Sequence, residues 1–209
     1  MQLTTLVVGL ISATALWSGV QALNQQARNS YDRAAAIFGG TRIPMLVGQQ
    51  DPTFPQHLFV DLRRAGWPVS PVLEGRIRIY GKTLRLLGIE PVTFPTDAGS
   101  IPAIGKSDLR QFIAAPGETL VAPETLAELT GTEGAALQTD DGALLPPLKV
   151  QTQLAPGVMI VDVGLAQRIL HLPDRLSRML IGKARGKQTP LETIVGDKLR
   201  YVAPDAETD

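Results

Sequence analysis

The chain has 209 residues, enough for one or two domains with a sizeable core. Its 20 basic and 20 acidic residues balance, which argues against a nucleic-acid partner, because such partners normally require a basic excess. Cysteine is absent, so disulfides, thiol catalysis and thiolate metal sites are excluded.

Residues 3–23, "LTTLVVGLISATALWSGVQAL", carry no charge, and the first charged residue is Arg28. A helix of this length rises about 31 Å, close to the hydrocarbon thickness of a bilayer. We expect this segment to stay attached and span the membrane, because no basic residue precedes it and it exceeds a typical signal-peptide core. The apolar residues assigned to the span are Leu3, Leu6, Val7, Leu10, Ile11, Leu16, Trp17, Val20 and Leu23.

Two alternatives stay open for this segment. Val20-Gln21-Ala22 is a small-residue pattern that suits signal-peptide cleavage. A helix in a cytosolic core would normally show a polar face, and polar character here is limited to Thr, Ser and Gln21.

Residues 24–38, "NQQARNSYDRAAAIF", contain good helix formers and no Pro or Gly, and a Gly-Gly pair follows them. This pattern predicts a helical stalk that continues the membrane helix into water. Arg28, Arg33 and Arg42 follow the span. Taken literally, the positive-inside rule would place the rest of the chain in the cytoplasm.

The first elements after the stalk are a strand and a helix. "RIPMLVG" over residues 42–48 reads as a strand, and "TFPQ" over residues 53–56 fits a capping box at a helix start. Gly66 ends this helix. Its apolar stripe consists of Leu58, Phe59, Leu62 and Ala65.

Residues 72–90, "VLEGRIRIYGKTLRLLGIE", form the clearest strand pair in the chain. Apolar residues alternate with arginines on both arms, and Gly81-Lys82 suits the tight turn between them. The arginines Arg76, Arg78 and Arg85 share one face. That face is either a binding patch or, more commonly, the solvated side of an antiparallel sheet.

The second half mixes short strands and helices. Residues 92–106 read as a connector, "ETLVAP" as a strand, and "PETLAELTG" as a short helix. Short strands surround a turn at Asp141-Gly142, and Asp162 is the expected N-cap between a strand and a helix in "GVMIVDVGLAQRIL". "RLSRMLIGKA" and "KLRYVAP" read as strands, and between them residues 189–192 fit a second capping box whose helix Gly196 closes. Because strands and helices do not strictly alternate, the sequence predicts an α+β fold.

No pattern in the sequence indicates catalysis, a cofactor or a metal. His57 and His171 stand in no metal-ligand spacing, and we expect each on a helix surface or end. Asp140-Asp141 adjoins a glycine, so a turn explains it. Lys183, Arg185 and Lys187 form a basic cluster that is either a contact for a partner or lipid headgroups, or a solvated hairpin loop. The residues therefore indicate a non-catalytic domain held on a membrane.

Several of these segments occur in an order that resembles a known family. "YGKTLRLLGIEP", together with the apolar leader, "SYDRAAAIFGG", "ETLVAPETLAELTG", "VMIVDVGLAQRIL" and "RLSRML", is similar to the extracytoplasmic part of FtsX-like, MacB-like ABC transporter permeases. The resemblance covers nearly the whole chain. Its motifs are structural, and it carries over no catalytic residue.

The resemblance implies an arrangement of domains. Residues 1–40 would be a transmembrane helix and stalk, residues 41–105 and 158–209 a mixed α/β porter-like subdomain with the tail, and residues 106–157 a strand-rich, sabre-like insertion. It also implies that the domain faces the periplasm from the bacterial inner membrane. We expect the chain to be a piece of a longer permease that ends just before a second membrane helix.

Two hypotheses for function follow. In the first, the domain passes conformational change from a cytoplasmic ATP-binding subunit, reached through other parts of the permease, to a periplasmic substrate or partner protein. Membrane lipid and a second permease copy are further expected partners, and nucleic acid is not. In the second, the chain is a membrane-anchored binding or assembly protein that works without an ATPase. An enzyme is the third and least supported interpretation.

Overall fold

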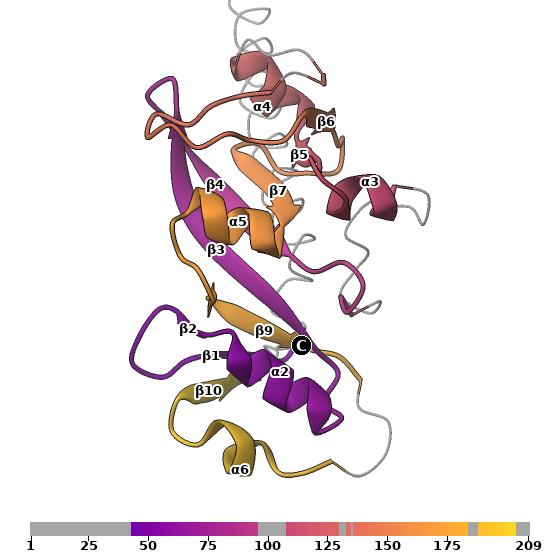
Figure 1. The fold of residues 1–209 in the computed structure, drawn as a ribbon, viewed down its shortest axis with the longest axis vertical. Coiled ribbons are helices and arrows are strands. Elements are labelled where there is room, and N and C mark those ends of the chain that lie inside the picture. Colours follow the sequence, from indigo (N-terminus) through magenta and orange to yellow (C-terminus); the bar gives the residue numbers. More distant parts are fainter. Residues whose placement is uncertain (1–42, 96–107, 130–132, 135, 184–187, 204–209) are drawn as a thin grey trace, which may run out of the picture.

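The computed structural model describes residues 43–95, 108–129, 133–134, 136–183 and 188–203 (Figure 1). The predicted membrane span and stalk lie outside these residues, and no helix within them is long and apolar enough to cross a membrane. The strands are β1 (Met45–Gly48), β2 (Phe54–Pro55), β3 (Val69–Ile79), β4 (Lys82–Ile89), β5 (Thr119–Val121), β6 (Leu148–Val150), β7 (Val158–Asp162), β8 (Arg175–Leu176), β9 (Arg178–Ile181) and β10 (Leu199–Val202). The helices are α2 (His57–Arg64), α3 (Leu109–Ile113), α4 (Pro123–Glu128), α5 (Val163–Ile169) and α6 (Leu191–Val195).

One eight-stranded sheet organises the domain, in the order β10-β1-β9-β3-β4-β7-β5-β6. Neighbours are antiparallel except for β4–β7 and β5–β6, which are parallel. β2 and β8 form a separate two-stranded pair. A mixed sheet with irregularly placed helices is an α+β fold, so the predicted fold class is confirmed.

The long β3–β4 hairpin is where sequence predicted it, but its turn is shifted. Ile79 pairs with Lys82, so the two turn residues are Tyr80 and Gly81 and not Gly81-Lys82. Their φ angles of 51° and 75° are both positive, as a type I′ turn requires. The carboxylate of Asp140 accepts a hydrogen bond from the Gly81 N–H at 3.0 Å. This contact comes from a distant part of the sequence, which a local turn pattern cannot include.

Both predicted capping boxes are wrong. Helix α2 begins at His57, without a side-chain cap, because Phe54 and Pro55 extend into β2. Helix α6 begins at Leu191 after Pro190, also without a side-chain cap. The prediction for Asp162 is confirmed, since its carboxylate accepts a hydrogen bond from the Gly164 N–H at 2.9 Å.

Other elements agree with the sequence pattern or refine it. The predicted strand over 175–184 divides at Ser177, because β8 pairs with β2 whereas β9 pairs with β1 and β3. The helix in "PETLAELTG" begins with Pro123 at its first turn, as predicted. The turn at Asp141-Gly142 is also present, with a φ of 93° at Gly142.

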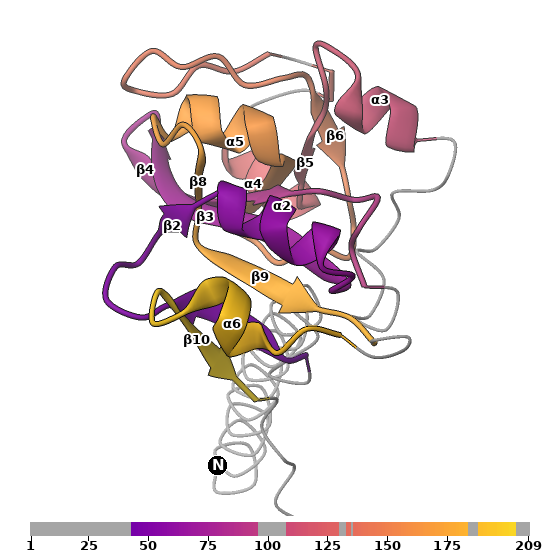
Figure 2. The ribbon, with the colours of Figure 1, turned by 60° about the horizontal axis from the view of Figure 1, so that its bottom comes forward.

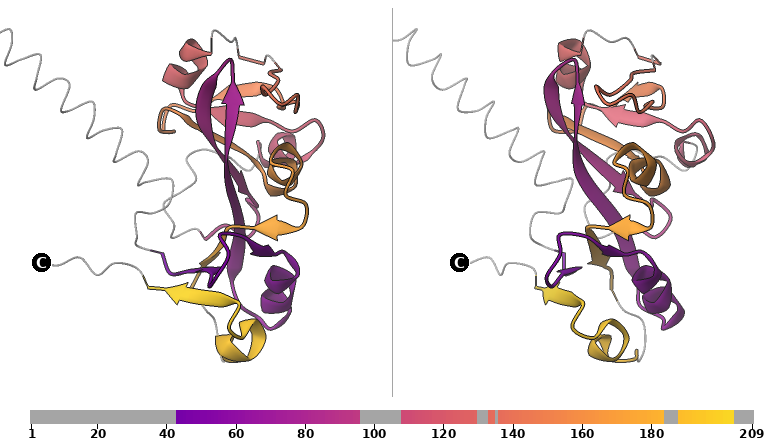
Figure 3. Two further views of the ribbon diagram at one scale, coloured as in Figure 1. Left: turned by 90° about the vertical axis from the view of Figure 1, so that its left-hand side faces the viewer. Right: turned by 60° about the vertical axis from the view of Figure 1, so that its left-hand side comes forward.

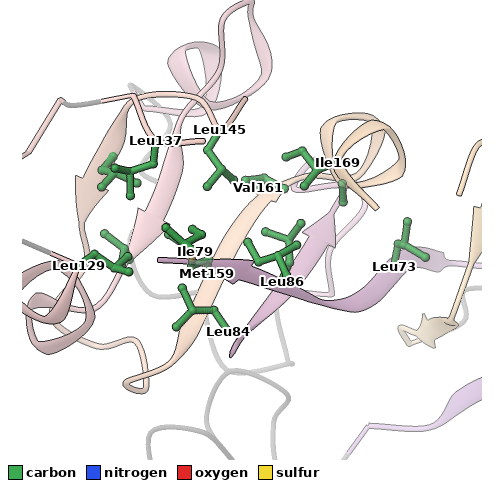
Figure 4. Close-up of a cluster of buried hydrophobic side chains, with 14 residues drawn as sticks. Leu73, Ile79, Leu84, Leu86, Leu129, Leu137, Leu145, Met159, Val161 and Ile169 are labelled. Carbon is green, nitrogen blue, oxygen red and sulfur yellow. The ribbon is translucent and has the colours of Figure 1, made fainter. Parts of the chain in front are cut away.

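Helices α2, α5 and α6 cover one face of the sheet. Figure 3 shows α2 and α5 on the same side of the long hairpin. Helices α2 and α6 contact each other over the β1–β10 end of the sheet (Figure 2). Beneath α5 lies an apolar cluster in which Leu73, Ile79, Leu86, Met159 and Ile169 are each at most 4% exposed (Figure 4).

The packing of α5 on β4 requires a glycine. A Cβ atom on Gly88 would lie 2.3 Å from the Cβ of Ala166 and 3.0 Å from the Cα of Val163. No side chain fits at such distances, so Gly88 and Ala166 together set how closely α5 approaches the sheet.

The opposite face carries a second core next to a polar area. Phe112 of α3 packs there against Leu87, Ile89, Leu120 and Ile160. Toward the turn of the hairpin, the same face of β3 and β4 carries charged side chains instead of apolar ones. At the base of the hairpin, side chains on both faces are therefore buried. In its outer half, only the side chains on the α5 face are buried.

The predicted insertion shares this sheet with the rest of the domain. Of its elements, β5 pairs with β7 and β6 pairs with β5, at one end of the strand order. β1 and β10 lie at the other end, where Met45 pairs with Val202. The division into a porter-like part and a sabre-like insertion stays a prediction.

Candidate functional site

The clearest polar cluster in the described residues lies on the arginine face of the hairpin. The even-numbered residues of β3, which include Glu74, Arg76 and Arg78, lie on the face of the sheet away from α5. Arg85 on β4 and Arg178 on β9 point to the same face, because they pair with Arg76 and Val72 of β3. Three neighbouring strands thus bring four arginines and one glutamate together.

Glu74 is the centre of this cluster. Its carboxylate lies 2.5 Å from Nε of Arg85 and 2.9 Å from a terminal nitrogen of Arg178. Partial burial alone would raise the pKa of Glu74, but the hydrogen bonds and charges of the two arginines outweigh it and hold the pKa below its usual value. Burial also lowers the pKa of Arg178, and Glu74 opposes that shift. The cluster is a charged network held by strand register.

A cleft of about 820 Å³ opens over this network. Glu74, Arg76 and Arg85 supply its charged lining, and Thr53, Thr83 and Ser177 supply hydroxyl groups. Ser177 is held by Glu74, whose backbone N–H donates to the Ser177 hydroxyl at 2.9 Å. Thr53 is held by Arg175, whose Nε donates to its hydroxyl at 3.1 Å. Arg76 and Arg78 on the predicted arginine face are exposed. The face is not flat, because it forms one wall of this cleft.

A second candidate surface lies at the tip of the hairpin. Tyr80 and Leu144 are large apolar residues that are 67% and 72% exposed. The loop that carries Leu144 is attached to the hairpin, because the Asp140 N–H donates to the carbonyl of Arg78 at 2.8 Å and the Asp140 carboxylate accepts from Gly81. These hydrogen bonds fix the position of the loop relative to the hairpin turn.

The remaining residues considered from sequence have structural surroundings. His57 is an exposed residue at the start of α2, and His171 is exposed just after α5, 3.5 Å from Asp141. Asp140 and Asp141 form the expected turn, in which Asp141 accepts a hydrogen bond from the Thr139 hydroxyl. That hydrogen bond is the main reason why the pKa of Asp141 is lowered.

Two groups of predictions fall partly or wholly outside what the structure describes. All nine residues assigned to the membrane span do so, as do two members of the basic cluster, Arg185 and Lys187. Over the described ranges, no group of three or more His, Asp or Glu residues is placed to hold a metal ion.

Sequence reasoning missed the Glu74 network. Glu74 and Arg178 are 104 positions apart, and their meeting depends on the pairing of β3 with β9. The available signal was Glu74 itself, a charged residue that directly follows Val72 and Leu73 in β3. A charged residue in such a place normally has a partner of opposite charge.

A known protein matches the chain in sequence. No family model matches the chain. The chain is 26% identical to an uncharacterised ABC transporter permease protein of Mycobacterium tuberculosis, over an alignment of 226 positions that covers 100% of this chain and 26% of the relative. The chain thus spans about a quarter of that permease.

Two solved structures match the chain. The periplasmic region of MacB from Actinobacillus actinomycetemcomitans matches with a TM-score of 0.52 and 9% identity, covering 81% of this chain and 92% of the other. The extracellular domain of the noncanonical ABC-type transporter YknZ from Gram-positive bacteria matches with a TM-score of 0.44 and 13% identity, covering 69% and 83%. The predicted resemblance to the extracytoplasmic part of a MacB-like ABC transporter permease is confirmed: the sequence match is to a permease, and the fold is similar to that of the periplasmic region of MacB.

Proposed function

We propose that the chain supplies the periplasmic domain of an ABC transporter permease subunit in a bacterial inner membrane. In this role it transmits conformational change, driven by ATP hydrolysis in the cytoplasm, to a substrate or partner protein in the periplasm. The observation that carries the proposal is the similarity over the whole chain to one part of a longer ABC transporter permease. The MacB-like fold supports it as a likeness of architecture.

The arrangement of the sheet suits a domain attached at one end. Met45, at the start of β1, pairs with Val202, at the end of β10, so the chain enters and leaves the described domain side by side. Figure 1 shows β1 and β10 at the lower end and the turn of the β3–β4 hairpin at the upper end. Two adjacent connections can move such a domain as one body.

The hairpin provides a stiff link between the two ends. β3 has 11 residues and at about 3.4 Å per residue extends roughly 37 Å. It is hydrogen-bonded to β9 over Val69–Val72 and to β4 over Val72–Ile79, and α5 packs against both β3 and β4. A displacement at the β1–β10 end therefore reaches the hairpin tip without a flexible joint in the described elements.

We assign contact with a periplasmic partner to the tip. Tyr80 is exposed at the turn and Leu144 on the loop attached to it, and aromatic residues are enriched at protein interfaces. The expected ATP-binding subunit lies on the other side of the membrane and contacts parts of the permease beyond this chain.

Affinity purification tests the proposal. The complete protein that contains this chain is tagged and purified from native membranes in mild detergent, and the co-purified proteins are identified by mass spectrometry. We expect a stoichiometric P-loop ATPase, and ATP hydrolysis by the complex. A complete protein that carries no ATPase partner and hydrolyses no ATP would contradict the proposal and favour a membrane-anchored binding or assembly protein.

A further inference from the structure

Two arginines face each other across the hairpin. Arg76 on β3 is paired with Arg85 on β4. Because Ile79 and Lys82 close a two-residue turn, the pairs alternate along the ladder, and Arg76–Arg85 is a pair without mutual backbone hydrogen bonds. The Arg85 N–H accordingly donates to the carbonyl of Gly157, at 2.9 Å, on the other side of β4. Such pairs bring their Cα atoms to about 4.5 Å, and like charges placed directly opposite each other destabilise a sheet.

The two arginines differ in their partners. Arg85 forms an ion pair with Glu74, which also holds Arg178. Arg76 is exposed, and its side chain makes no ion pair or hydrogen bond with any residue in the part of the chain that the structure describes. The one carboxylate in the cleft lining is therefore occupied by other arginines.

The cleft offers room and donors beside Arg76. Its volume of about 820 Å³ lies within the range of about 300–1,000 Å³ that is usual for small-molecule sites. Gly75 and Gly157 contribute wall without side chains, and the hydroxyls of Thr53, Thr83 and Ser177 lie along it. Guanidinium and hydroxyl donors together suit an acceptor with several oxygens.

We propose that this cleft is a binding site for a ligand that carries a phosphate group, held by the guanidinium group of Arg76 opposite Arg85. A guanidinium presents a planar fork of donors that matches phosphate oxygens. Glu74 supplies one negative charge beside Arg76, Arg85 and Arg178. A phosphate bound to the fork of Arg76, next to Arg85, adds the negative charge that this group of arginines lacks. A single carboxylate has too few oxygens to satisfy both arginines and the hydroxyls. The phosphate comes either from a soluble solute or from a lipid headgroup.

Calorimetric titration of the full 209-residue chain, in detergent and phosphate-free buffer, tests the proposal. The two probes are inorganic pyrophosphate and a short-chain, water-soluble phosphatidic acid. We expect Arg76→Ala to weaken binding at least about tenfold, because hydrogen bonds to charged groups contribute about 1.5–3 kcal/mol. We expect Arg76→Lys to restore only part of the affinity, since an ammonium keeps the charge but not the fork.

Arg200→Ala is the matched control. Arg200 is exposed on β10, at the far end of the same sheet, and its loss changes the net charge by the same amount. We expect less than a twofold effect. Binding of pyrophosphate identifies a soluble ligand, and binding of the lipid alone that depends on Arg76 identifies a headgroup. The proposal is overturned if neither probe binds, or if Arg76→Ala and Arg200→Ala weaken binding equally. Circular dichroism confirms that each variant is folded.

Discussion

Replacing two neighbouring residues of β3, Ile79 and Arg78, should have very different effects on stability. Ile79 is 0% exposed and lies in the apolar cluster beneath α5. Ile79→Ala removes three carbon groups at about 0.8 kcal/mol each, and the cavity that remains adds to the loss. We expect the free energy of unfolding to fall by roughly 2–4 kcal/mol.

Arg78 points to the opposite face, and its side chain is 66% exposed. Its guanidinium lies 3.9 Å from the carboxylate of Asp140, which is itself 40% exposed. Solvent screens such a pair, so Arg78→Ala should cost less than about 0.5 kcal/mol. The contacts of Asp140 with the backbone of Arg78 and Gly81 remain in the variant.

Urea denaturation of the segment 41–204, followed by circular dichroism, measures both losses. The unfolding slope should stay the same in the two variants, because both unfold from the same sheet. Equal losses from the two substitutions would refute the assignment of faces in β3. A large loss from Arg78→Ala alone would refute it more strongly.

Three further predictions concern packing, pH and the leader. Gly88→Ala should destabilise the segment by about 1–3 kcal/mol because its Cβ would lie 2.3 Å from the Cβ of Ala166. Gly164→Ala should cost less, because its Cβ would lie 3.2 Å from a side-chain oxygen of Asp162 and alanine favours the helix. Equal melting temperatures of the two variants would contradict this. The pKa of Glu74 is lowered in the folded chain from 4.5, so its contribution to stability is present above that pH and is lost as pH falls through the folded value. The unfolding free energy of Glu74→Gln should therefore fall less with acid than that of the parent chain, and parallel pH profiles would count against the ion-pair network. Mass spectrometry of the membrane fraction should find residues 3–23 still attached, and a mature N-terminus at Leu23 would mean that the leader is cleaved.

Local patterns predicted the elements whose structure depends on near neighbours. The alternation of Ile77 and Ile79 with arginines fixes which face of β3 is buried, because a strand has a period of two. Asp162 caps α5 through the N–H of Gly164, two residues away, and Gly196 ends α6, the helix directly before it. These predictions are confirmed because no distant contact competes with them.

Distant contacts explain where the sequence predictions were wrong or incomplete. Thr53 does not cap α2, because β8 pairs with Phe54 and Arg175 binds Thr53 from more than a hundred positions away. The hairpin turn lies at Tyr80-Gly81, where Asp140 binds the Gly81 N–H. The charge network around Glu74 likewise depends on β9 reaching β3. Glu74 signals that an oppositely charged partner exists, but a single sequence does not show which strand supplies it, so the arginine face was predicted while its cleft was not.

In the proposed function, ATP hydrolysis on one side of the membrane moves this domain on the other. Energy transfer between the hairpin tip and the membrane measures that movement. The chain has no cysteine, so Tyr80→Cys provides one exposed labelling site, and any cysteine elsewhere in the complete permease is replaced. The labelled permease is reconstituted with its ATP-binding subunit in nanodiscs that contain acceptor-labelled lipid.

We expect transfer efficiency to differ between the nucleotide-free and the ATP-bound complex. Inserting Gly-Gly after Ser30, in the segment expected to be the helical stalk, should remove this difference while ATP hydrolysis persists, since each glycine costs a helix about 1 kcal/mol. Identical transfer in both nucleotide states of the permease without the insertion, with ATP hydrolysis measured on the same preparation, would show that hydrolysis does not move this domain.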